Sequence, residues 1–184
     1  MDLFAGLDAV PAGFGPSAVT IGKFDGVHVG HRGVIGQLKT LAAERGLAPV
    51  VLTFDRHPMA LFRPEACPPA LVSSAQRAEL LATEGIAATL EVEFTREFSE
   101  LSPEAFVDDV LVGKLDAKLV LAGADFRFGH KGAGTIDTLR ELGASRGFEV
   151  ALVDDVAVAG ERVSSTRIRE HLAAGRVREA AELL

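Results

Sequence analysis

Short apolar runs alternate with longer stretches of helical periodicity along most of the chain. The runs have four or five residues, as buried strands do, and are expected at 18–21, 50–54, 88–92, 119–122 and 150–153. Between them, apolar residues return every three or four positions. This spacing predicts helices, several ended by a glycine, at 31–45, 74–84, 103–112 and 135–146. Alternation of this kind predicts an α/β fold, with a parallel sheet covered by helices on both faces.

Two segments depart from the alternation. Residues 61–72 contain three prolines, so we expect no regular element there but a mobile flap or the edge of a small subdomain. Residues 164–184 form a C-terminal helical segment, with short helices expected at 165–173 and 176–183. The whole chain, residues 1–184, is expected to form one domain.

The loops that follow three of the expected strands are expected to meet. Right-handed crossovers in a parallel sheet bring ligands to the carboxyl ends of the strands. The loops 22–30, 55–58 and 123–129 leave the strands at that edge. The order of elements therefore predicts one cleft shared by all three loops.

Composition limits what the cleft can bind. The chain has 184 residues, is 48% hydrophobic and carries a net charge of −7, which argues against broad binding to nucleic acid or to an anionic membrane. An anionic ligand must therefore be held locally. Cys67 is the single cysteine, so an internal disulfide or a cysteine-based zinc site is excluded. The N-terminus lacks the pattern of a secretory signal and no run approaches ~18 apolar residues, so we expect a cytoplasmic protein.

Two histidines mark the start of the first long helix. His28 and His31 follow an apolar strand and a glycine-containing loop, where unpaired helix amides and the helix dipole favour an anion. Gly22, Gly26 and Gly30 leave no side chain to keep a phosphate from the backbone. Imidazole N–H groups here can donate to the charged oxygens of a phosphoryl transition state. The alternative is a capped helix start with two incidental histidines.

Two further segments have polar groups suited to a nucleotide. Ser164, Ser165 and Thr166 stand at an expected helix start and are followed by Arg169, a combination able to hold the phosphates that leave as pyrophosphate. A plain N-cap is the alternative, and Arg167 is expected to point to solvent. Asp125 lies in a glycine-flanked loop and can bind a ribose or a metal-bound phosphate, unless it is only a turn carboxylate.

Four motifs together carry a family resemblance. His28-Val29-Gly30-His31 matches the HxGH motif of the nucleotidyltransferase superfamily. Read with 22–27, 53–58, 123–129 and 164–169, which occur in the family's order, the chain resembles the FMN adenylyltransferase module of prokaryotic bifunctional FAD synthetase from about residue 19 to 184. The resemblance implies a Rossmann-like nucleotidyltransferase fold. It also implies adenylyl transfer from Mg-ATP to FMN, by in-line attack at the α-phosphorus, giving FAD and pyrophosphate.

The resemblance also assigns roles to single residues. It implies His28, His31 and Arg169 as catalytic, with Mg²⁺ as cofactor on ligands it does not identify. The residues implied for ATP are Gly22, Lys23, Phe24, Asp25, Gly30, Asp125, Ser164, Ser165 and Thr166. Those implied for FMN are Asp55, His57, Phe62, Phe126 and Phe128. Phe126 and Phe128 are equally compatible with the core.

The sequence departs from the family pattern in two places. Lys23 stands where asparagine is common and Arg56 where proline is usual, and both changes add positive charge. A riboflavin kinase module normally follows this region in full-length relatives. No such segment is expected within these 184 residues, which would be either an excised module or a naturally short protein. The expected partners are small-molecule substrates, with no nucleic acid and no membrane. Two alternatives remain: another HxGH enzyme of the pantetheine-phosphate or glycerol-phosphate type, and a non-catalytic flavin- or nucleotide-binding regulatory domain.

Overall fold

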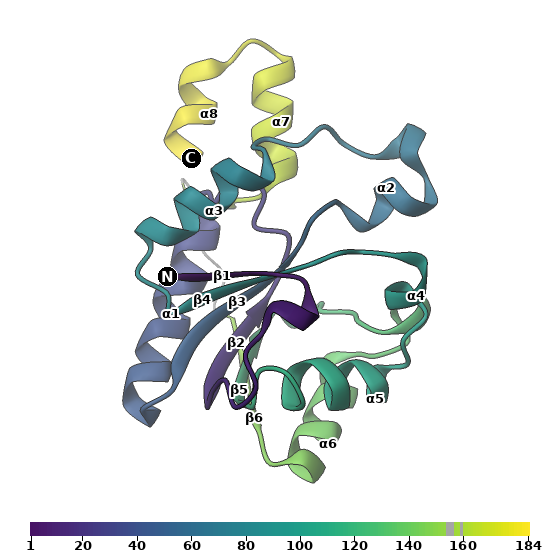
Figure 1. Cartoon of the computed structure of the whole chain (residues 1–184). Coiled ribbons are helices and arrows are strands. Elements are labelled where there is room, and N and C mark those ends of the chain that lie inside the picture. The colour runs from purple at the N-terminus through teal and green to yellow at the C-terminus, as the bar shows by residue number, and fades with distance from the viewer. Residues whose placement is uncertain (154–156, 159) are drawn as a thin grey trace.

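Six parallel strands form the centre of the protein. The structure, a computed structural model, describes residues 1–153, 157–158 and 160–184. The sheet has the order β1-β4-β3-β2-β5-β6, and every neighbouring pair is parallel (Figure 1). The strands are β1 (Asp2–Ala5), β2 (Ser17–Ile21), β3 (Ala48–Phe54), β4 (Ala88–Val92), β5 (Ala117–Ala122) and β6 (Glu149–Leu152). The predicted parallel α/β fold is confirmed.

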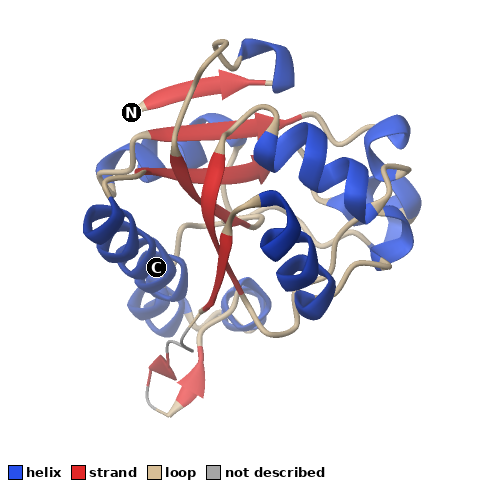
Figure 2. Cartoon of the chain, turned by 90° about the horizontal axis from the view of Figure 1, so that it is seen from below, coloured by secondary structure: helices blue, strands red, loops and turns tan. Residues whose placement is uncertain are grey.

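Helices cover both faces of this sheet (Figure 2). Alternate strand residues point to opposite faces, so both faces of these apolar strands need a cover. On one face, α1 (Val29–Arg45) and α3 (Ser74–Thr83) pack on the sheet, with Leu38 and Leu81 fully buried. The other face is covered by α5 (Pro103–Ala105), the π-helix η3 (Phe106–Val112) and α6 (Ile136–Arg146).

The C-terminal segment lies beyond the carboxyl ends of the strands. Its helices α7 (Ser165–Ala173) and α8 (Val177–Leu183) pack on each other through a small core of their own, which also includes Leu71 (Figure 1). A short antiparallel pair, β7 (Ala157–Val158) and β8 (Glu161–Arg162), precedes them. The predicted C-terminal helices are confirmed, and α7 is brought next to the strand ends.

Three sequence expectations need correction. Strand β1 was not predicted, since only one of its four residues is buried. The expectation of no regular element at 61–72 is wrong in part, because α2 (Pro58–Phe62) and the 3-10 helix η2 (Pro64–Ala66) reach into it. Both helices begin with proline, which costs no hydrogen bond at the first helical position. The helix at 103–112 is present, but its second part is π-helical.

The remaining short helices lie in loops: η1 (Leu7–Ala9), α4 (Arg96–Ser99) and η4 (His130–Gly132).

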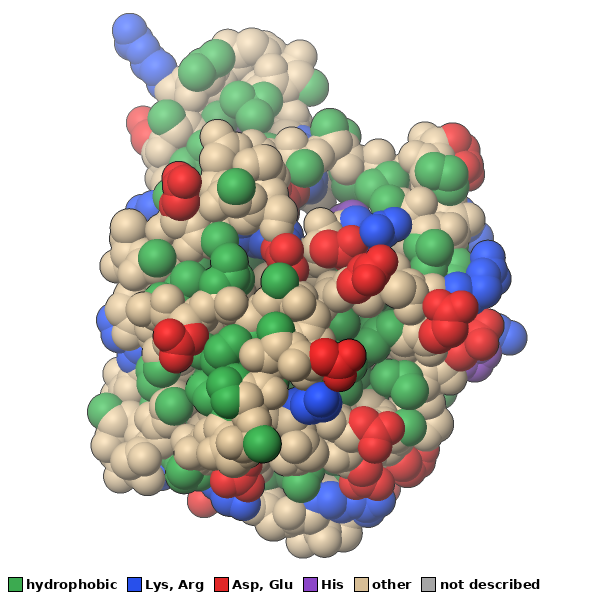
Figure 3. Space-filling model, viewed as in Figure 1, with side chains coloured by type: hydrophobic (Ala, Val, Ile, Leu, Met, Phe, Trp, Pro, Cys, Tyr) green, Lys and Arg blue, Asp and Glu red, His purple; other side chains and the backbone are tan. Residues whose placement is uncertain are grey.

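The strand order sets the position of the cleft. After β2 the chain continues to β3 on one side, whereas β5 pairs with β2 on the other side. The loops after β2 and β5 therefore diverge at neighbouring strand ends, which is the usual ligand position in open α/β sheets. Figure 3 shows the molecular surface hollowed between the C-terminal helices and the α2 region, with a histidine visible inside.

Candidate active site

A polar cavity of about 660 Å³ opens at the diverging loops. The loops after β2 and β5 line it together with the start of α7. Every residue predicted for catalysis or ATP lies in its lining: Gly22, Lys23, Phe24, Asp25, His28, Gly30, His31, Asp125, Ser164, Ser165, Thr166 and Arg169. The structure therefore brings together motifs that lie up to 147 positions apart, from 22 to 169.

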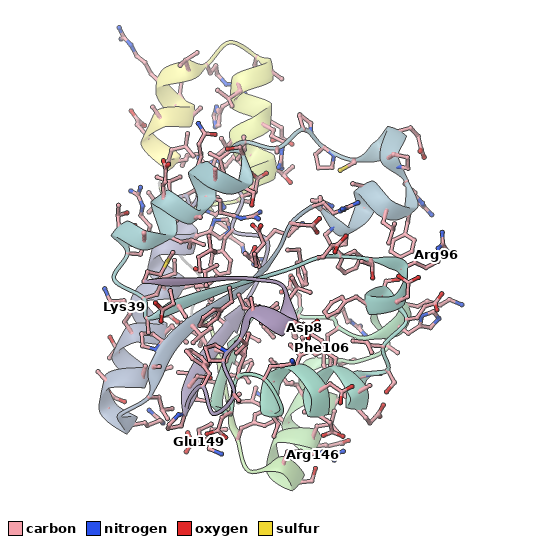
Figure 4. All side chains as sticks on the ribbon, in the orientation of Figure 1. Asp8, Lys39, Arg96, Phe106, Arg146 and Glu149 are labelled. Atoms are coloured by element: carbon pink, nitrogen blue, oxygen red, sulfur yellow. The ribbon has the colours of Figure 1, made fainter. Side chains whose placement is uncertain are left out.

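An apolar cavity of about 960 Å³ adjoins the polar one. Three of the phenylalanines in its lining come from three different segments. Phe98 is in α4, Phe106 begins η3, and Phe128 lies in the loop before η4. Figure 4 shows the labelled Phe106 below the sheet and the labelled Arg96, which also lines this cavity, at the outer edge. The predicted FMN residues His57, Phe62, Phe126 and Phe128 are part of this lining.

Asp55 was predicted to contact FMN, yet it lies outside both linings. Its carboxylate accepts hydrogen bonds from the backbone N–H of Phe94 at 2.8 Å and from Arg56 Nε at 2.8 Å. Asp55 therefore ties the end of β3 to the chain after β4. In the structure it supports the wall of the apolar cavity instead of facing into it.

His28 and His31 form one stacked unit at the start of α1. His28 is the N-cap residue, and its Nδ1 accepts from the backbone N–H of His31 at 3.3 Å. The ring centroids are 3.6 Å apart and the planes are 17° from parallel. Because Nδ1 acts as an acceptor, the neutral His28 ring carries its proton on Nε2. The His31 ring also contacts Phe24, with centroids 5.0 Å apart, which gives Phe24 a supporting role beside its place in the lining.

Both histidines are neutral at physiological pH. Burial lowers the pKa of His28 to about 4, although the Asp25 carboxylate and a backbone hydrogen bond act in the opposite direction. Burial, with the nearby His28 and Lys23, lowers the pKa of His31 to about 3. The rings therefore act as neutral hydrogen-bond donors. Nδ1 of His31 is buried and has no hydrogen-bond partner among the described residues.

Gly30 has a second role besides the one predicted. A Cβ at this position would lie 3.1 Å from the His28 ring and 3.2 Å from the Val163 carbonyl oxygen. Glycine thus lets His28 and the chain before α7 pack against the start of α1. The absence of a side chain at Gly30 lets the His28 ring pack against the start of α1 and also leaves the backbone accessible.

The start of α7 faces the same cavity as the start of α1. Ser164 is a true N-cap, because its Oγ accepts from the backbone N–H of Arg167 at 3.2 Å. Ser165 Oγ donates to the Asp25 carbonyl oxygen at 3.0 Å, and Thr166 is exposed. The residues at this helix start therefore both cap α7 and line the polar cavity. Arg167 does not point to solvent as expected, since its Nη2 pairs with Glu161 at 3.2 Å.

Arg169 and Asp25 form an ion pair that connects three segments. The Asp25 carboxylate pairs with the Arg169 guanidinium and accepts from the backbone N–H of Leu71 at 2.9 Å and of Val72 at 3.3 Å. Arg169 Nε also donates to the Pro69 carbonyl oxygen at 2.7 Å. These contacts hold residues 69–72 against the loop after β2 and against α7. The mobility predicted for 61–72 remains a prediction.

The loop after β5 contributes to both cavities. Asp125 is exposed in the polar cavity, with its carboxylate 3.8 Å from Arg162 Nη1. Phe126 and Phe128 stack with centroids 5.5 Å apart. Phe128 is 6% exposed and belongs mainly to the core, where it contacts Phe106, while Phe126 lines both cavities.

Arg77 is a supporting residue that the sequence analysis missed. From α3, its Nη2 donates to the Phe54 carbonyl oxygen at 2.7 Å and to Glu91 Oε2 at 2.6 Å, and its Nη1 reaches the Lys23 carbonyl oxygen at 3.4 Å. It thereby fixes the chain at the ends of β2 and β3. The sequence signal that could have identified Arg77 as a buried residue is its position four residues before Leu81, on the apolar side of the helix.

Removing Arg77 should destabilise the protein strongly. We expect Arg77→Met to lower the free energy of unfolding by about 3 kcal/mol, because a mostly buried carboxylate on Glu91 is left without its partner. Urea unfolding measures the loss. In the double variant Arg77→Met/Glu91→Leu much of it should return, since no charge then lacks a partner. Equal losses in the two variants would contradict this explanation.

Metal-binding groups are sparse around these cavities. Among the described residues, no group of three or more His, Cys, Asp or Glu side chains could hold a metal ion. No helix in the described part of the chain is long and apolar enough to cross a membrane.

Several known proteins resemble this chain. The bifunctional riboflavin kinase/FMN adenylyltransferase of Listeria monocytogenes is 42% identical over 167 residues, which cover 90% of this chain and 52% of that protein. The protein of the same name from Pseudomonas fluorescens is 36% identical over 184 residues, covering all of this chain and 59% of that protein. The chain thus spans just over half the length of these relatives.

Two solved structures match the fold. A Streptococcus pneumoniae structure titled macrolide-efflux protein has a TM-score of 0.83 and 26% identity, covering 99% of this chain and 60% of that one. Pantoate-beta-alanine ligase from Francisella tularensis has a TM-score of 0.60 and 12% identity, covering 97% and 78%. The latter likeness, at 12% identity, shows the fold alone.

A sequence model of the FAD synthetase family matches residues 12–167. This match covers most of the chain and includes the loop after β2, the loop after β5 and the start of α7. The chain belongs to the FAD synthetase family.

Proposed function

We propose that this chain transfers the adenylyl group of Mg-ATP to the phosphate of FMN, giving FAD and pyrophosphate. The observation that carries the proposal is the pair of adjoining cavities, one with many charged and polar groups in its lining and one lined mainly by apolar side chains. A nucleoside triphosphate suits the polar cavity, and the planar flavin ring suits the phenylalanine-lined one. Where the cavities join, the two substrates would bring their phosphates together.

The polar cavity favours a polyphosphate because two helices begin there. The first amides of a helix have no partner within it and attract anions, and both α1 and α7 have this end at the lining. The exposed Thr166 hydroxyl and the Arg169 guanidinium add donors on the α7 side. We propose that the β- and γ-phosphates lie against α7, and that the α-phosphate lies near His28 and His31.

The proposed reaction is an in-line displacement. An oxygen of the FMN phosphate forms a bond to the α-phosphorus, and the bond from that phosphorus to the oxygen bridging to the β-phosphate breaks. The FMN phosphate is already anionic at neutral pH, so no strong base is needed. His28 Nε2–H donates to oxygens that gain charge in the transition state, and His31 is the second donor. Catalysis then rests on alignment and on fixed hydrogen-bond donors.

Mg²⁺ fits this site as a part of the nucleotide substrate. Mg²⁺ is usually held by one or two carboxylates together with substrate phosphates and water, and it neutralises charge on the phosphates. Asp125 is the exposed carboxylate in the polar lining and is the residue we propose for it. The described residues offer no larger ligand cluster, in keeping with a metal that arrives on ATP.

The decisive experiment measures substrate and reaction together. Incubation with FMN, ATP and MgCl₂ should yield FAD and equal amounts of pyrophosphate, resolved by chromatography and by a phosphate assay. Riboflavin in place of FMN is the control and should yield nothing, because it lacks the attacking phosphate. CTP with glycerol phosphate, and ATP with pantetheine phosphate, test the related transferases. Flavin binding without pyrophosphate release would indicate a regulatory domain instead.

A further inference from the structure

Lys23 lies where the two cavities join. Five residues line both cavities: Ile21, Gly22, Lys23, His57 and Phe126. Lys23 is the only lysine or arginine among these five, and it follows Gly22 directly in the loop after β2. If the proposed function holds, this is the point where the FMN phosphate and the α-phosphate of ATP meet.

The Lys23 amine has no acidic partner in the described part of the chain. No carboxylate there forms a salt bridge with it, and the nearest acidic group along the loop, Asp25, is already bonded to Arg169 and to the amides of residues 71 and 72. Partial burial and the Arg169 charge lower the pKa of the amine, while Asp25 and Cys67 act in the opposite direction. An anion beside Lys23 would therefore be strongly favoured.

The His57 ring lies beside the amine but gives it no hydrogen-bond acceptor. Lys23 Nζ lies 2.9 Å from His57 Nε2, while His57 Nδ1 accepts from the backbone N–H of Met59 at 3.1 Å. Burial, Lys23 and Arg169 lower the pKa of His57, so the ring is neutral and has one N–H. With Nδ1 accepting, that N–H is on Nε2 and faces the amine. Because two donors face each other, the Lys23 ammonium gains no hydrogen bond from His57. A phosphate oxygen would supply the acceptor that it lacks.

We propose that Lys23 is the cation that bridges the two reacting phosphates, holding the FMN phosphate against the α-phosphate of ATP. In the structure the amine lies beside His57 and is free to bond to phosphate oxygens. Because Lys23 contacts the phosphate and not the ring system, it sets the preference of the flavin cavity for FMN over riboflavin. This inference rests on the proposed function, but its main test needs no turnover.

Flavin affinity provides that test. Quenching of flavin fluorescence gives the Kd of FMN and of riboflavin for the wild-type protein and for Lys23→Met. We expect FMN binding to weaken about tenfold or more in Lys23→Met and riboflavin binding to change less than about twofold, because a charge-assisted hydrogen bond to phosphate is lost. Lys23→Arg keeps the charge and should keep most of the preference for FMN. With Mg-ATP present, Lys23→Met should also lower kcat for FAD formation.

Lys39→Met is the matched control. Lys39 is on α1 and lines neither cavity, and its amine donates to the Glu84 carbonyl oxygen (Figure 4). Its loss removes one positive charge and should leave the FMN-to-riboflavin ratio as in the wild type. Equal ratios in Lys23→Met and wild type, or equal affinities of the wild type for both flavins, would overturn the inference and leave the proposed function standing. If the wild type binds neither flavin, both fail.

Discussion

His28→Asn should lower kcat for FAD formation by about 10²–10³-fold, the usual cost of removing one fixed donor to a charged transition state. Asparagine is a good N-cap residue, so its side-chain oxygen can still accept from the His31 N–H and keep the start of α1. What is lost is the imidazole Nε2–H. FMN affinity should change by less than about threefold, because the flavin cavity does not include His28. Steady-state kinetics and flavin fluorescence measure the two quantities.

Two further variants make this result specific. His31→Gln should lower kcat in the same way, since His31 lines the polar cavity but not the apolar one. His171→Asn, the same substitution on α7 outside both linings, should change kcat little. A parallel loss of FMN affinity and turnover in His28→Asn would mean that the residue binds substrate without favouring the transition state.

The protein should lose stability as the pH falls from 7 to 5. Burial lowers the pKa of His28 to about 4 and that of His31 to about 3, from 6.5 for both in the absence of the fold. Below pH 6.5 the unfolded chain therefore binds protons that the folded chain does not, and the free energy of unfolding falls with pH. The slope is about 1.4 kcal/mol per pH unit for each histidine, so the loss at pH 5 reaches about 4 kcal/mol for the pair.

Urea unfolding at a series of pH values measures this dependence. The double variant His28→Asn/His31→Gln is the control and should have a much shallower slope above pH 5, with His57 contributing to what remains because its pKa is also lowered. An unchanged slope in the double variant would show that the stacked histidines are not the cause.

The order of elements was predictable because it depends on local patterns. Apolar runs and helical periodicity gave five of the six strands of the main sheet and the long helices on both faces. The edge strand β1 was not expected because only one of its four residues is buried, and the helices α2 and η2 were not expected because prolines at their starts were interpreted as breaks. The strand order in the sheet, which places β5 beside β2, came from tertiary packing.

The residues of the polar cavity were predictable because each motif has a local signature. One motif has glycines beside histidines, and the other has hydroxyl residues before an arginine. Each indicates a phosphate site wherever it stands in the chain. Asp55 lies outside both linings because a carboxylate at a strand end is also a good acceptor for backbone amides, and here it accepts from the N–H of Phe94. Arg77 was missed because its partners are backbone carbonyl oxygens far from it in sequence.

By itself, the sequence determined the fold class, the helix starts that attract anions and the residues at them, because these follow from periodicity and from the chemistry of neighbouring positions. Only the tertiary structure decided that His28 and His31 stack and stay neutral, that Asp25 binds Arg169, and that Lys23 stands at the junction of two cavities. Burial and charge at those atoms depend on segments that meet only when the sheet is assembled.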